Sequence, residues 1–566
     1  MKACEERTDD RPANEPGPRD SSASSDGATR PCHRGLVIVA LLVVYAAGLT
    51  HGLSRPWIGM HDWNGAFFSQ LARNLLRYPI SVHHGMGVVA VGEAVPPAEE
   101  RSLYAAHPPA LIWLVALAFR LLGEAEWVAR LVPILASLGS LALLIWLVKQ
   151  SLGSETAMLA GLVYAVSPMT VFFGRMVDHE AVCLFLMLAA LACWRVATAD
   201  LVLTKPQAVA ARIGWVAAIA GGIWVDWCGV LFAGLFSIHA LLQFKRGRVR
   251  GGLASTAVGV SLLATLGMLA HLVYGGLEGR FSDLMAIFVS RAANPNVEAV
   301  HKGFLAPEGP WRHIVGNLTW PTMLFAGVGL VRAVFLILGR STPAPRHGDE
   351  SGRSQAIEGW WVLLATGVLW LCVLWRQFER HNYWTFYLGP PTAVWAAEAL
   401  LAVRNRLSPM GRRSASGVYY AAVALVVAAA LRGTDGYFTI VSYPGEAVSA
   451  WRQINAATGP NDRVLFYLDP VLPEQRGQYL LRNLVPTQQT YYLDRPFGVE
   501  KNLAAVIEKA SDYSVYVLPV SVALSRSEHV SALESRFPCK VLGMGEAGSG
   551  YAVEVFDLRR GDHRQP

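Results

Sequence analysis

The sequence predicts an α-helical protein that crosses a membrane many times and carries a small α/β domain outside the membrane. Hydrophobic residues make up 53% of the 566 residues. Charged residues make up only 16%, whereas an average soluble domain carries about 25%. Apolar stretches long enough to span a bilayer recur between residues 36 and 431. These observations exclude a soluble multidomain protein, a disordered chain, a fibrous repeat and a small disulfide scaffold.

The first element is a polar tail, residues 1–34, which is rich in Ser, Pro, Asp and Arg and is predicted to be disordered and cytoplasmic. The apolar run Leu36–Leu53 lies behind this long tail and shows no obvious small-residue cleavage site, so we predict a first span rather than a cleavable signal peptide. Ten further stretches have spanning length, at 127–148, 156–173, 181–198, 208–225, 228–244, 252–275, 319–338, 359–375, 385–403 and 416–431.

Whether the short apolar segment Pro108–Leu122 spans the membrane decides on which side of the membrane each later loop lies. The segment has only 15 residues, which suits an interfacial or re-entrant helix better than a span. If it does not span, the basic clusters Lys149, Lys245–Arg250 and Arg404–Arg413 all fall in cytoplasmic loops, as the positive-inside rule requires. We therefore predict eleven spans in the plasma membrane, with the N-terminus in the cytoplasm and the C-terminal region outside.

The net charge of +7 is accordingly an orientation signal, and it predicts no nucleic-acid partner. The predicted domains are a transmembrane domain (35–431), which includes a long first external loop (54–126), and an external α/β domain (432–566). In the latter, the helix-like stretch Val522–Phe537 alternates with the strand-like runs Val464–Leu468, Val515–Val520 and Tyr551–Phe556. Only one of the seven cysteines, Cys539, is external, so no external disulfide framework is expected, and no Cys/His spacing resembles a zinc site.

The acids and bases on the predicted outer side gather at a few helix ends. Asp62 opens a stretch in which Trp63, Phe67, Leu71 and Leu75 recur every four residues, so we predict an amphipathic helix on the outer leaflet. Asp favours the N-cap of a helix, and a capping residue is also free to act in catalysis. Both interpretations of Asp62 stay open on the local pattern.

Two other external segments are rich in ionisable side chains. Arg175–Glu180 places several charged groups beside the membrane, where they are costly unless paired or hydrated; alternatively, they end two helices in headgroup water. Arg376–Trp384 combines cations with aromatic rings, which suits a lipid headgroup or a phosphate, or an aromatic belt with snorkelling Arg. Asp226 beside Trp227 is a weaker case of the same kind.

The order of these segments resembles the polyprenyl-phosphate-sugar glycosyltransferases of the GT-C fold, which include protein O-mannosyltransferases and aminoarabinose transferases. The resemblance covers roughly residues 35–400. The similar stretches are His107–Leu111, Leu122–Trp127, Ala129–Pro133, Ser167–Phe173 followed by Arg175 and Asp178, and Arg380, His381 and Tyr383 before Leu388–Pro391. In that family the segment equivalent to 108–122 is a juxtamembrane helix.

The resemblance implies a sugar transfer in which Asp62 acts as general base on the acceptor hydroxyl. Asp178 would be the second catalytic acid, and Arg380 and His381 would hold the lipid phosphate. The other implied substrate-binding residues are His61, His107, Arg175, His179, Glu180 and Tyr383. The chain departs from the family in having His61-Asp62 where an Asp-Glu pair is usual, and Trp224–Trp227 where a Lys is frequent.

The expected function is therefore a glycosyltransferase that moves a sugar from a polyprenyl-phosphate carrier to a protein, lipid or glycan acceptor at the outer face. The donor is itself a substrate, and a divalent metal near Asp178–Glu180 is left open. Two alternatives also stay open. A transporter or lipid flippase would carry ionisable groups near mid-membrane, often in repeated halves, and an inactive scaffold would explain the altered first-loop motif.

Overall fold

A computed structural model describes residues 30–98, 102–198, 204–293, 310–338, 350–378, 381–467, 487–500, 502–525, 527–542 and 552–560. The chain divides into two compact units, Met1–Ala40 and Leu41–Pro566. All contacts discussed below lie within the second unit. The predicted tail, 1–34, falls almost entirely outside the described residues.

Each predicted span coincides with a helix. In chain order these are α1 (Arg30–Thr50), α5 (Glu126–Leu152), α6 (Ser154–Val166) followed by η2 (Met169–Phe173), α7 (His179–Thr198), α8 (Lys205–Val225), α9 (Trp227–Lys245), α10 (Gly251–Ala270) followed by η3 (His271–Gly276), α13 (Trp320–Leu338), α14 (Glu350–Leu374), α15 (Gly389–Leu407) preceded by η7 (Asn382–Leu388), and α16 (Arg412–Phe438). The last of them continues beyond residue 431, at which the sequence prediction ends it.

The structure confirms a multi-pass helical membrane protein. Within the described residues, seven helices are long and apolar enough to cross a membrane, or eight if the bent pair Trp311–Leu318 and Trp320–Phe335, which meet at 93°, forms one span. Three more predicted spans appear as shorter apolar helices, Gly35–Thr50, Ser154–Val166 and Gly359–Leu374. The count of eleven spans therefore stays a prediction.

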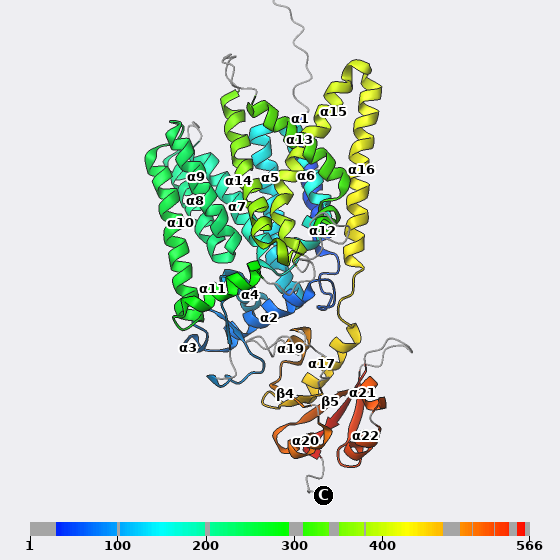
Figure 1. The fold of residues 1–566 in the computed structure, drawn as a ribbon. Helices are drawn as coiled ribbons and strands as arrows, with labels where there is room; N and C mark the ends of the chain where they lie inside the picture. Colours follow the sequence, from blue (N-terminus) through cyan, green and yellow to red (C-terminus); the bar gives the residue numbers. More distant parts are fainter. Residues whose placement is uncertain are drawn as a thin grey trace, which may run out of the picture. The chain divides into compact units, whose positions relative to one another are not determined.

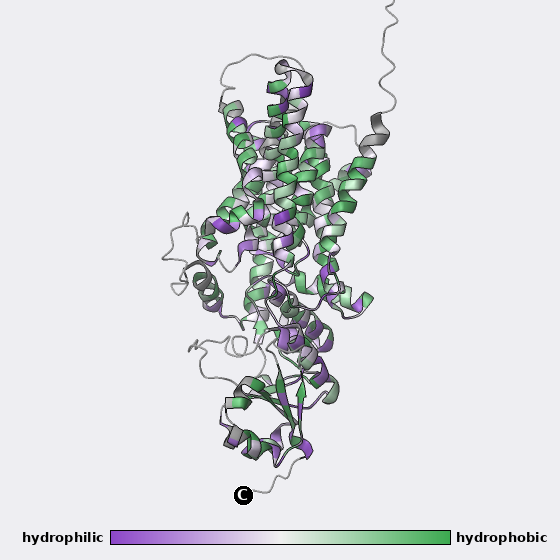
Figure 2. Cartoon of the chain, turned by 90° about the vertical axis from the view of Figure 1, so that its right-hand side faces the viewer, coloured by the Kyte–Doolittle hydropathy of each residue, from purple (hydrophilic) through white to green (hydrophobic). Residues whose placement is uncertain are grey.

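The spanning helices pack against one another in a bundle (Figure 1), in which α7 contacts α8 and α13 contacts α15 most extensively. Figure 2 shows hydrophobic residues along most of the length of these helices. Small residues allow the closest approaches, as is usual between membrane helices. A Cβ at Gly329 of α13 would lie 2.1 Å from the carbonyl oxygen of Trp395 in α15, so this crossing requires glycine.

The first loop folds into a compact layer made of α2 (Asp62–Arg77), α3 (Ile80–His83), the antiparallel pair β1 (Gly87–Val89) and β2 (Ser102–Tyr104), and α4 (Ala110–Leu122). The predicted helix after Asp62 is thus present as α2. The expectation that its apolar stripe faces lipid is wrong, because Phe67 and Leu71 are buried against protein. Helix α2 contacts α4, β1 and the C-terminal region.

Helix α4 corresponds to the short segment that sets the predicted orientation. At 13 residues it is about 20 Å long, shorter than the hydrocarbon core of a bilayer. One face, with Leu111, Val115 and Phe119, is buried. The opposite face exposes the apolar side chains of Leu114, Leu117 and Leu121, and the position of α4 at the membrane surface stays a prediction.

The C-terminal region contains a five-stranded mixed sheet. Its elements are α17 (Gly445–Ala457), β3 (Val464–Phe466), α19 (Thr487–Leu493), β4 (Phe497–Val499), α20 (Leu503–Glu508), β5 (Val515–Pro519), α21 (Val520–Ser525), α22 (Ser527–Glu534), β6 (Cys539–Leu542) and β7 (Val553–Asp557). The strand order is β4-β3-β5-β7-β6. Strands β4, β3 and β5 are parallel, whereas β7 pairs antiparallel with both β5 and β6. The three predicted strand-like runs overlap β3, β5 and β7.

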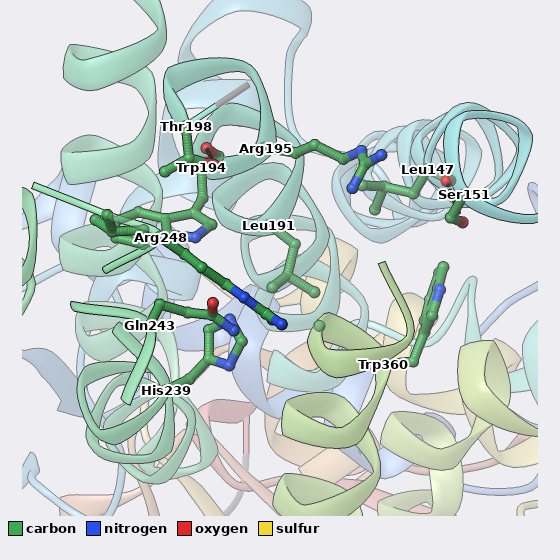
Figure 3. A pocket seen from close by; sticks show the side chains of 12 residues that line it. Leu147, Ser151, Leu191, Trp194, Arg195, Thr198, His239, Gln243, Arg248 and Trp360 are labelled. Carbon is green, nitrogen blue, oxygen red and sulfur yellow. Dashed lines mark hydrogen bonds between the residues drawn. The ribbon is translucent and has the colours of Figure 1, made fainter. Parts of the chain in front are cut away.

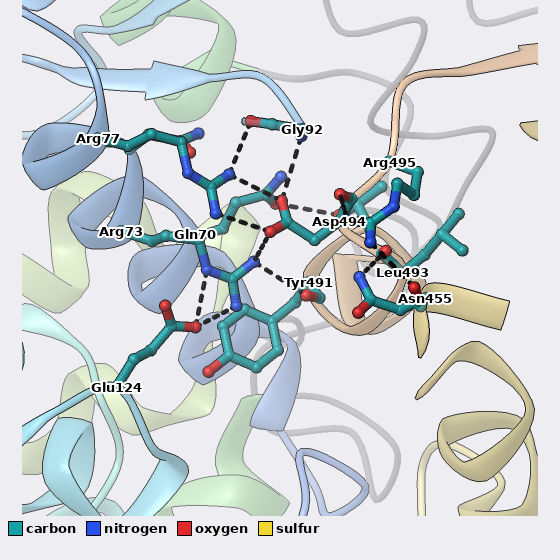
Figure 4. A network of polar contacts seen from close by, with 12 residues as sticks. Gln70, Arg73, Arg77, Gly92, Glu124, Asn455, Tyr491, Leu493, Asp494 and Arg495 are labelled. Atoms are coloured by element: carbon teal, nitrogen blue, oxygen red, sulfur yellow. Dashed lines mark hydrogen bonds and ion pairs between the residues drawn. The ribbon is translucent and has the colours of Figure 1, made fainter. Parts of the chain in front are cut away.

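A polar network joins this region to the first loop (Figure 4). Arg73 and Arg77, one turn apart on α2, both reach the carboxylate of Asp494, which follows α19. The Arg77 guanidinium donates to both carboxylate oxygens at 3.0 and 2.8 Å, and the Gly92 N–H donates to one of them at 3.2 Å. Arg73 also pairs with Glu124. Since Asp62 begins α2, the C-terminal region helps to fix the helix that carries this residue.

Candidate functional site

Asp62 stands at a turn between the first loop and the membrane helices. It is the first residue of α2, and its predecessor His61 has φ 57°, in the left-handed region. Its Oδ2 accepts the backbone N–H of Gly59 at 2.7 Å, and its Oδ1 lies 3.4 Å from the Arg130 guanidinium. The predicted N-cap role for Asp62 is therefore wrong by one position, because the N-cap is His61. The carboxylate closes a turn and faces Arg130.

Asp178 lies in a buried polar cluster that also contains Asn64. The Asn64 side-chain amide donates to Asp178 Oδ2 at 2.6 Å. The other carboxylate oxygen, Oδ1, accepts the backbone N–H of His179 at 2.8 Å and lies 2.7 Å from its ring Nδ1. Asp178 is 5% exposed and Asn64 is 1% exposed, so nearly every polar contact of this carboxylate is made by protein.

His107 and Asp226 extend this cluster. The rings of His107 and His179 stack with centroids 4.4 Å apart, and His107 Nδ1 lies 3.4 Å from Asp226 Oδ1. The Tyr387 hydroxyl donates to the other oxygen of Asp226. A glycine shapes the corner that presents Asp226, since a Cβ at Gly229 would lie 2.1 Å from the carbonyl oxygen of Gly222.

Two buried polar atoms of the cluster stand out. Among the described residues, neither Glu180 Oε2 nor His179 Nε2 has a hydrogen-bond partner, although the two side chains belong to residues that are 4% and 1% exposed. Glu180 is close enough to Asp178 and Asp226 for the three charges to interact. An unpaired buried polar atom is costly, and a ligand that supplied the missing hydrogen bond would remove this cost.

His61 connects the two predicted catalytic acids with the segment after α14. Its Nε2 lies 3.0 Å from Asn382 Oδ1, and its ring meets that of Tyr383 edge-on with centroids 5.2 Å apart. Burial lowers the pKa of His61 to about 4, although the nearby Asp178 and Asp62 act in the opposite direction. The ring is therefore neutral at physiological pH.

His381 hydrogen-bonds to the Tyr383 hydroxyl across 2.5 Å and stacks on Trp384 with centroids 4.6 Å apart. Arg380, predicted to act with it on a lipid phosphate, lies outside the described residues. Arg175 points the other way, toward α1, where it donates to the Gly52 carbonyl at 3.0 Å. The predicted site residues therefore do not form one group. His381 and Tyr383 lie beside Trp384, whereas Arg175 lies near the end of α1.

Charge within the acidic cluster is partly balanced by histidine. Burial by itself raises the pKa of the Asp178 carboxyl, but the hydrogen bond to His179 and the nearby His107 outweigh it, so the pKa is below its usual value. The pKa of Asp226 is lowered in the same way, against its burial, by His107 and His179. No three His, Cys, Asp or Glu side chains in the described ranges are grouped to hold a metal ion.

An apolar cavity of about 250 Å³ borders the cluster at His107. Its walls come from α9, α10, α14, η7 and α11 (Phe281–Ala293), and they include Trp227, Leu284 and Met285. Trp384, on which His381 stacks, also lines it. The lining is therefore mostly apolar and lies next to a histidine of the acidic cluster, His107.

The sequence pattern found most of the clustered residues but missed several of their partners. The sequence does not point to Asn64, Asn382 or Tyr387 as site residues, and it points only weakly to Asp226. Arg130 carried a warning signal, since a cation at the start of an apolar span needs a partner. Asn64 and Asn382 carry no such signal, because amides are common at helix ends.

Comparison with known proteins agrees with the fold. Residues 106–271 match the family model described as dolichyl-phosphate-mannose-protein mannosyltransferase. The structure of ArnT from Cupriavidus metallidurans bound to undecaprenyl phosphate is similar with a TM-score of 0.57 at 14% identity, over 94% of this chain and 99% of that chain. No curated protein matches the sequence significantly.

An archaeal protein shares the same architecture. The Archaeoglobus fulgidus oligosaccharyltransferase tethered to an acceptor peptide has a TM-score of 0.56 at 12% identity, over 89% of this chain and 71% of that chain. AglB from the same organism, in complex with an inhibitory peptide and a dolichol-phosphate, has a TM-score of 0.55 at 13% identity, over 94% of this chain and 75% of that chain. These similarities show that the chain has the fold of the GT-C membrane glycosyltransferases.

Proposed function

We propose that this protein is a glycosyltransferase that moves a sugar from a polyprenyl-phosphate-linked donor to an acceptor at the outer face of the plasma membrane. One observation carries the proposal. A buried cluster of acids and histidines, in which Glu180 Oε2 and His179 Nε2 lack partners among the described residues, adjoins an apolar cavity at His107. Sugar hydroxyls would satisfy the polar atoms, and the polyprenyl chain would occupy the cavity.

In this proposal Asp62 is the general base. Its carboxylate would accept the proton of the acceptor hydroxyl while that oxygen attacks the anomeric carbon. Displacement of the lipid phosphate from the opposite side would invert the anomeric centre. Arg130, 3.4 Å from Asp62, would hold this carboxylate in position beside the acceptor hydroxyl.

The roles of the other residues follow from their positions. Asp178, held by Asn64 and His179, would orient the sugar or the acceptor, together with Glu180. His107 lies at the border of the apolar cavity, and His381 and Tyr383 lie beside Trp384 at its wall. These side chains would bind the donor phosphate and stabilise its charge as it leaves. Arg380 is given the same role on the family resemblance alone.

The proposed orientation places the C-terminal region and the Asp62 site outside, with Lys149, Lys245–Arg250 and Arg404–Arg413 in the cytoplasm. The acceptor is a protein, a lipid or an envelope glycan. The relatives named above support the donor class, since two of them are described with undecaprenyl phosphate and with a dolichol-phosphate.

The direct test incubates the purified protein with radiolabelled polyprenyl-phosphate sugars and measures donor consumption. The wild-type chain and the variant Asp512→Asn, at an exposed position of the C-terminal region, should consume donor. Asp62→Asn should not, although it should still be expressed, fold and insert into the membrane. Full turnover by Asp62→Asn would eliminate the proposed base, and no turnover by the wild type with any donor would favour a transporter or a scaffold.

A further inference from the structure

A second cavity, of about 60 Å³, lies beside Asp62. It is enclosed by residues at the end of α1, the start of α5, η2 and the end of α16. No residue lines both this cavity and the apolar one. Helices α11 and α16, which border the apolar and the second cavity respectively, lie on opposite sides of the bundle in Figure 1.

The second cavity is strongly cationic. Its lining includes the three guanidinium groups of Arg55, Arg130 and Arg175, whereas Asp62 is its single carboxylate. Arg130 is occupied, since it faces Asp62 and donates to the carbonyl oxygens of Leu53 and Arg55. Among the described residues, Arg55 and Arg175 form no ion pair with a carboxylate.

Both of these arginines are nevertheless held in place. Arg55 donates to the carbonyl oxygen of Phe438 at 3.2 Å, and Arg175 lies over the Phe438 ring with 5.4 Å to its centroid. Each of these contacts uses only part of a guanidinium, which offers five N–H donors. Arginine side chains that are held in place in a small cavity and keep unused N–H donors suit the binding of an oxyanion.

The charge on Arg175 is poorly compensated by the protein groups around it. Burial, together with the positive charge of Arg130, lowers the pKa of Arg175 to about 10. Arg55 acts in the same direction, and Asp62 only partly opposes them. A bound anion would supply the missing counter-charge.

We propose that this cavity binds an oxyanion, a phosphate or carboxylate group, that belongs to the acceptor substrate. The assignment to the acceptor rests on the proposed function, in which the donor lipid occupies the separate apolar cavity at His107. An acceptor anchored by Arg55 and Arg175 would present a neighbouring hydroxyl to Asp62 at the cavity edge. The acceptor is thereby narrowed to an anionic glycan, lipid or peptide.

The test uses inorganic phosphate as the probe and the detergent-purified full chain as the receptor. Phosphate should raise the melting temperature of the wild-type protein in a saturable way. Arg55→Gln and Arg175→Gln should each weaken the apparent phosphate affinity at least tenfold. The matched control Arg559→Gln, at an exposed residue of the C-terminal region, should bind phosphate like the wild type. Equal affinity in all four proteins would overturn the assignment.

Two further arms identify the site and the source of the anion. Another cavity of about 60 Å³, near the other end of α5, is lined by Arg195 and Arg248 (Figure 3). If Arg195→Gln abolishes the phosphate effect and Arg55→Gln and Arg175→Gln do not, the anion binds in that cavity. Saturating undecaprenyl phosphate should leave phosphate binding intact, and competition would overturn the assignment to the acceptor. A wild-type chain that consumes donor but ignores phosphate contradicts only this inference, because donor consumption is measured separately.

Discussion

The side-chain amide of Asn64 donates a hydrogen bond to Asp178 across 2.6 Å and thereby joins two segments that are 114 residues apart in the chain. Asn64 belongs to the first turn of α2, two residues after Asp62. The contact therefore fixes the position of the first predicted acid relative to the second. It also excludes a carboxylate at position 64, because Asp178 would then face a second negative charge.

Changing Asn64 to Asp should destabilise the protein and reduce donor consumption. The variant loses a hydrogen bond to a charged group, which is worth about 1.5–3 kcal/mol, and adds like-charge repulsion. The loss should be smaller near pH 5 than at pH 8, because the pair then takes up a proton more readily. Melting temperatures of the wild type and the variant at the two pH values would measure the loss of stability, with Asn405→Asp, at an exposed position, as the control. Equal stability of Asn64→Asp and wild type would contradict the contact.

His61 should make stability depend on pH. Burial lowers its pKa to about 4 from the ordinary 6.5, so the unfolded chain takes up the proton first as the pH falls. The stabilising contribution is complete above about pH 6.5 and is lost progressively toward pH 4. His61→Asn should flatten the melting-temperature curve in that window. The control His84→Asn shares the left-handed backbone and is exposed, and it should leave the slope unchanged. An unaltered slope in His61→Asn would show that other groups cause the dependence.

The sequence could predict the helices because a long apolar run specifies a spanning helix without reference to the rest of the chain. Length and the basic loops also predict that α4 does not span the membrane. This stays a prediction, because Ala110–Leu122 is a shorter apolar helix like Ser154–Val166, which is predicted to span. The sequence could not predict that Phe67 and Leu71 on α2 face protein instead of lipid. An apolar stripe looks the same whether it meets lipid tails or other side chains, such as the ring of Tyr104, which meets that of Phe67 edge-on.

The candidate site was predictable to the extent that buried charges need partners. This reasoning selects Asp178, His179 and Glu180, which the structure brings together with His107. It does not reveal which amide or hydroxyl completes each pair. Asn64 and Tyr387 come from distant segments, and the cavity formed around Arg55 and Arg175 depends on the mutual placement of α1, η2 and α16.

Neutralising Asp494 should loosen the C-terminal region from the first loop. Asp494 is the shared partner of Arg73 and Arg77, and removing one member of a buried ion pair costs about 3 kcal/mol or more. We expect Asp494→Asn to lower the melting temperature by several degrees and to increase hydrogen exchange in α2. The control Asp557→Asn, whose partners Arg559 and Arg560 are exposed, should change neither. Unchanged exchange in α2 would mean that the network does not hold this helix.

The same carboxyl should confer sensitivity to acid. Burial alone would raise the pKa of Asp494, but Arg77 and Arg73 outweigh burial and hold the pKa below its ordinary value of 3.8. The stabilisation is therefore complete above that value and is lost as the pH falls through the lower pKa of the folded state. Exchange in α2 of the wild type should rise only in this acidic range, whereas Asp494→Asn should show high exchange at every pH.

Filling the apolar cavity should impair the lipid part of the donor selectively. Met285 of α11 lines this cavity, and Met285→Trp would occupy space that the polyprenyl chain needs. The KM for an undecaprenyl-phosphate sugar should rise at least tenfold, while turnover of a short-chain donor analogue should be nearly unchanged, because the acids and histidines are not altered. Leu262→Trp, on an exposed face of α10, adds the same ring without entering the cavity and should behave as wild type. A rise in KM for both donors would show that the substitution disturbs the acidic cluster. No rise for either donor would show that the lipid chain binds elsewhere.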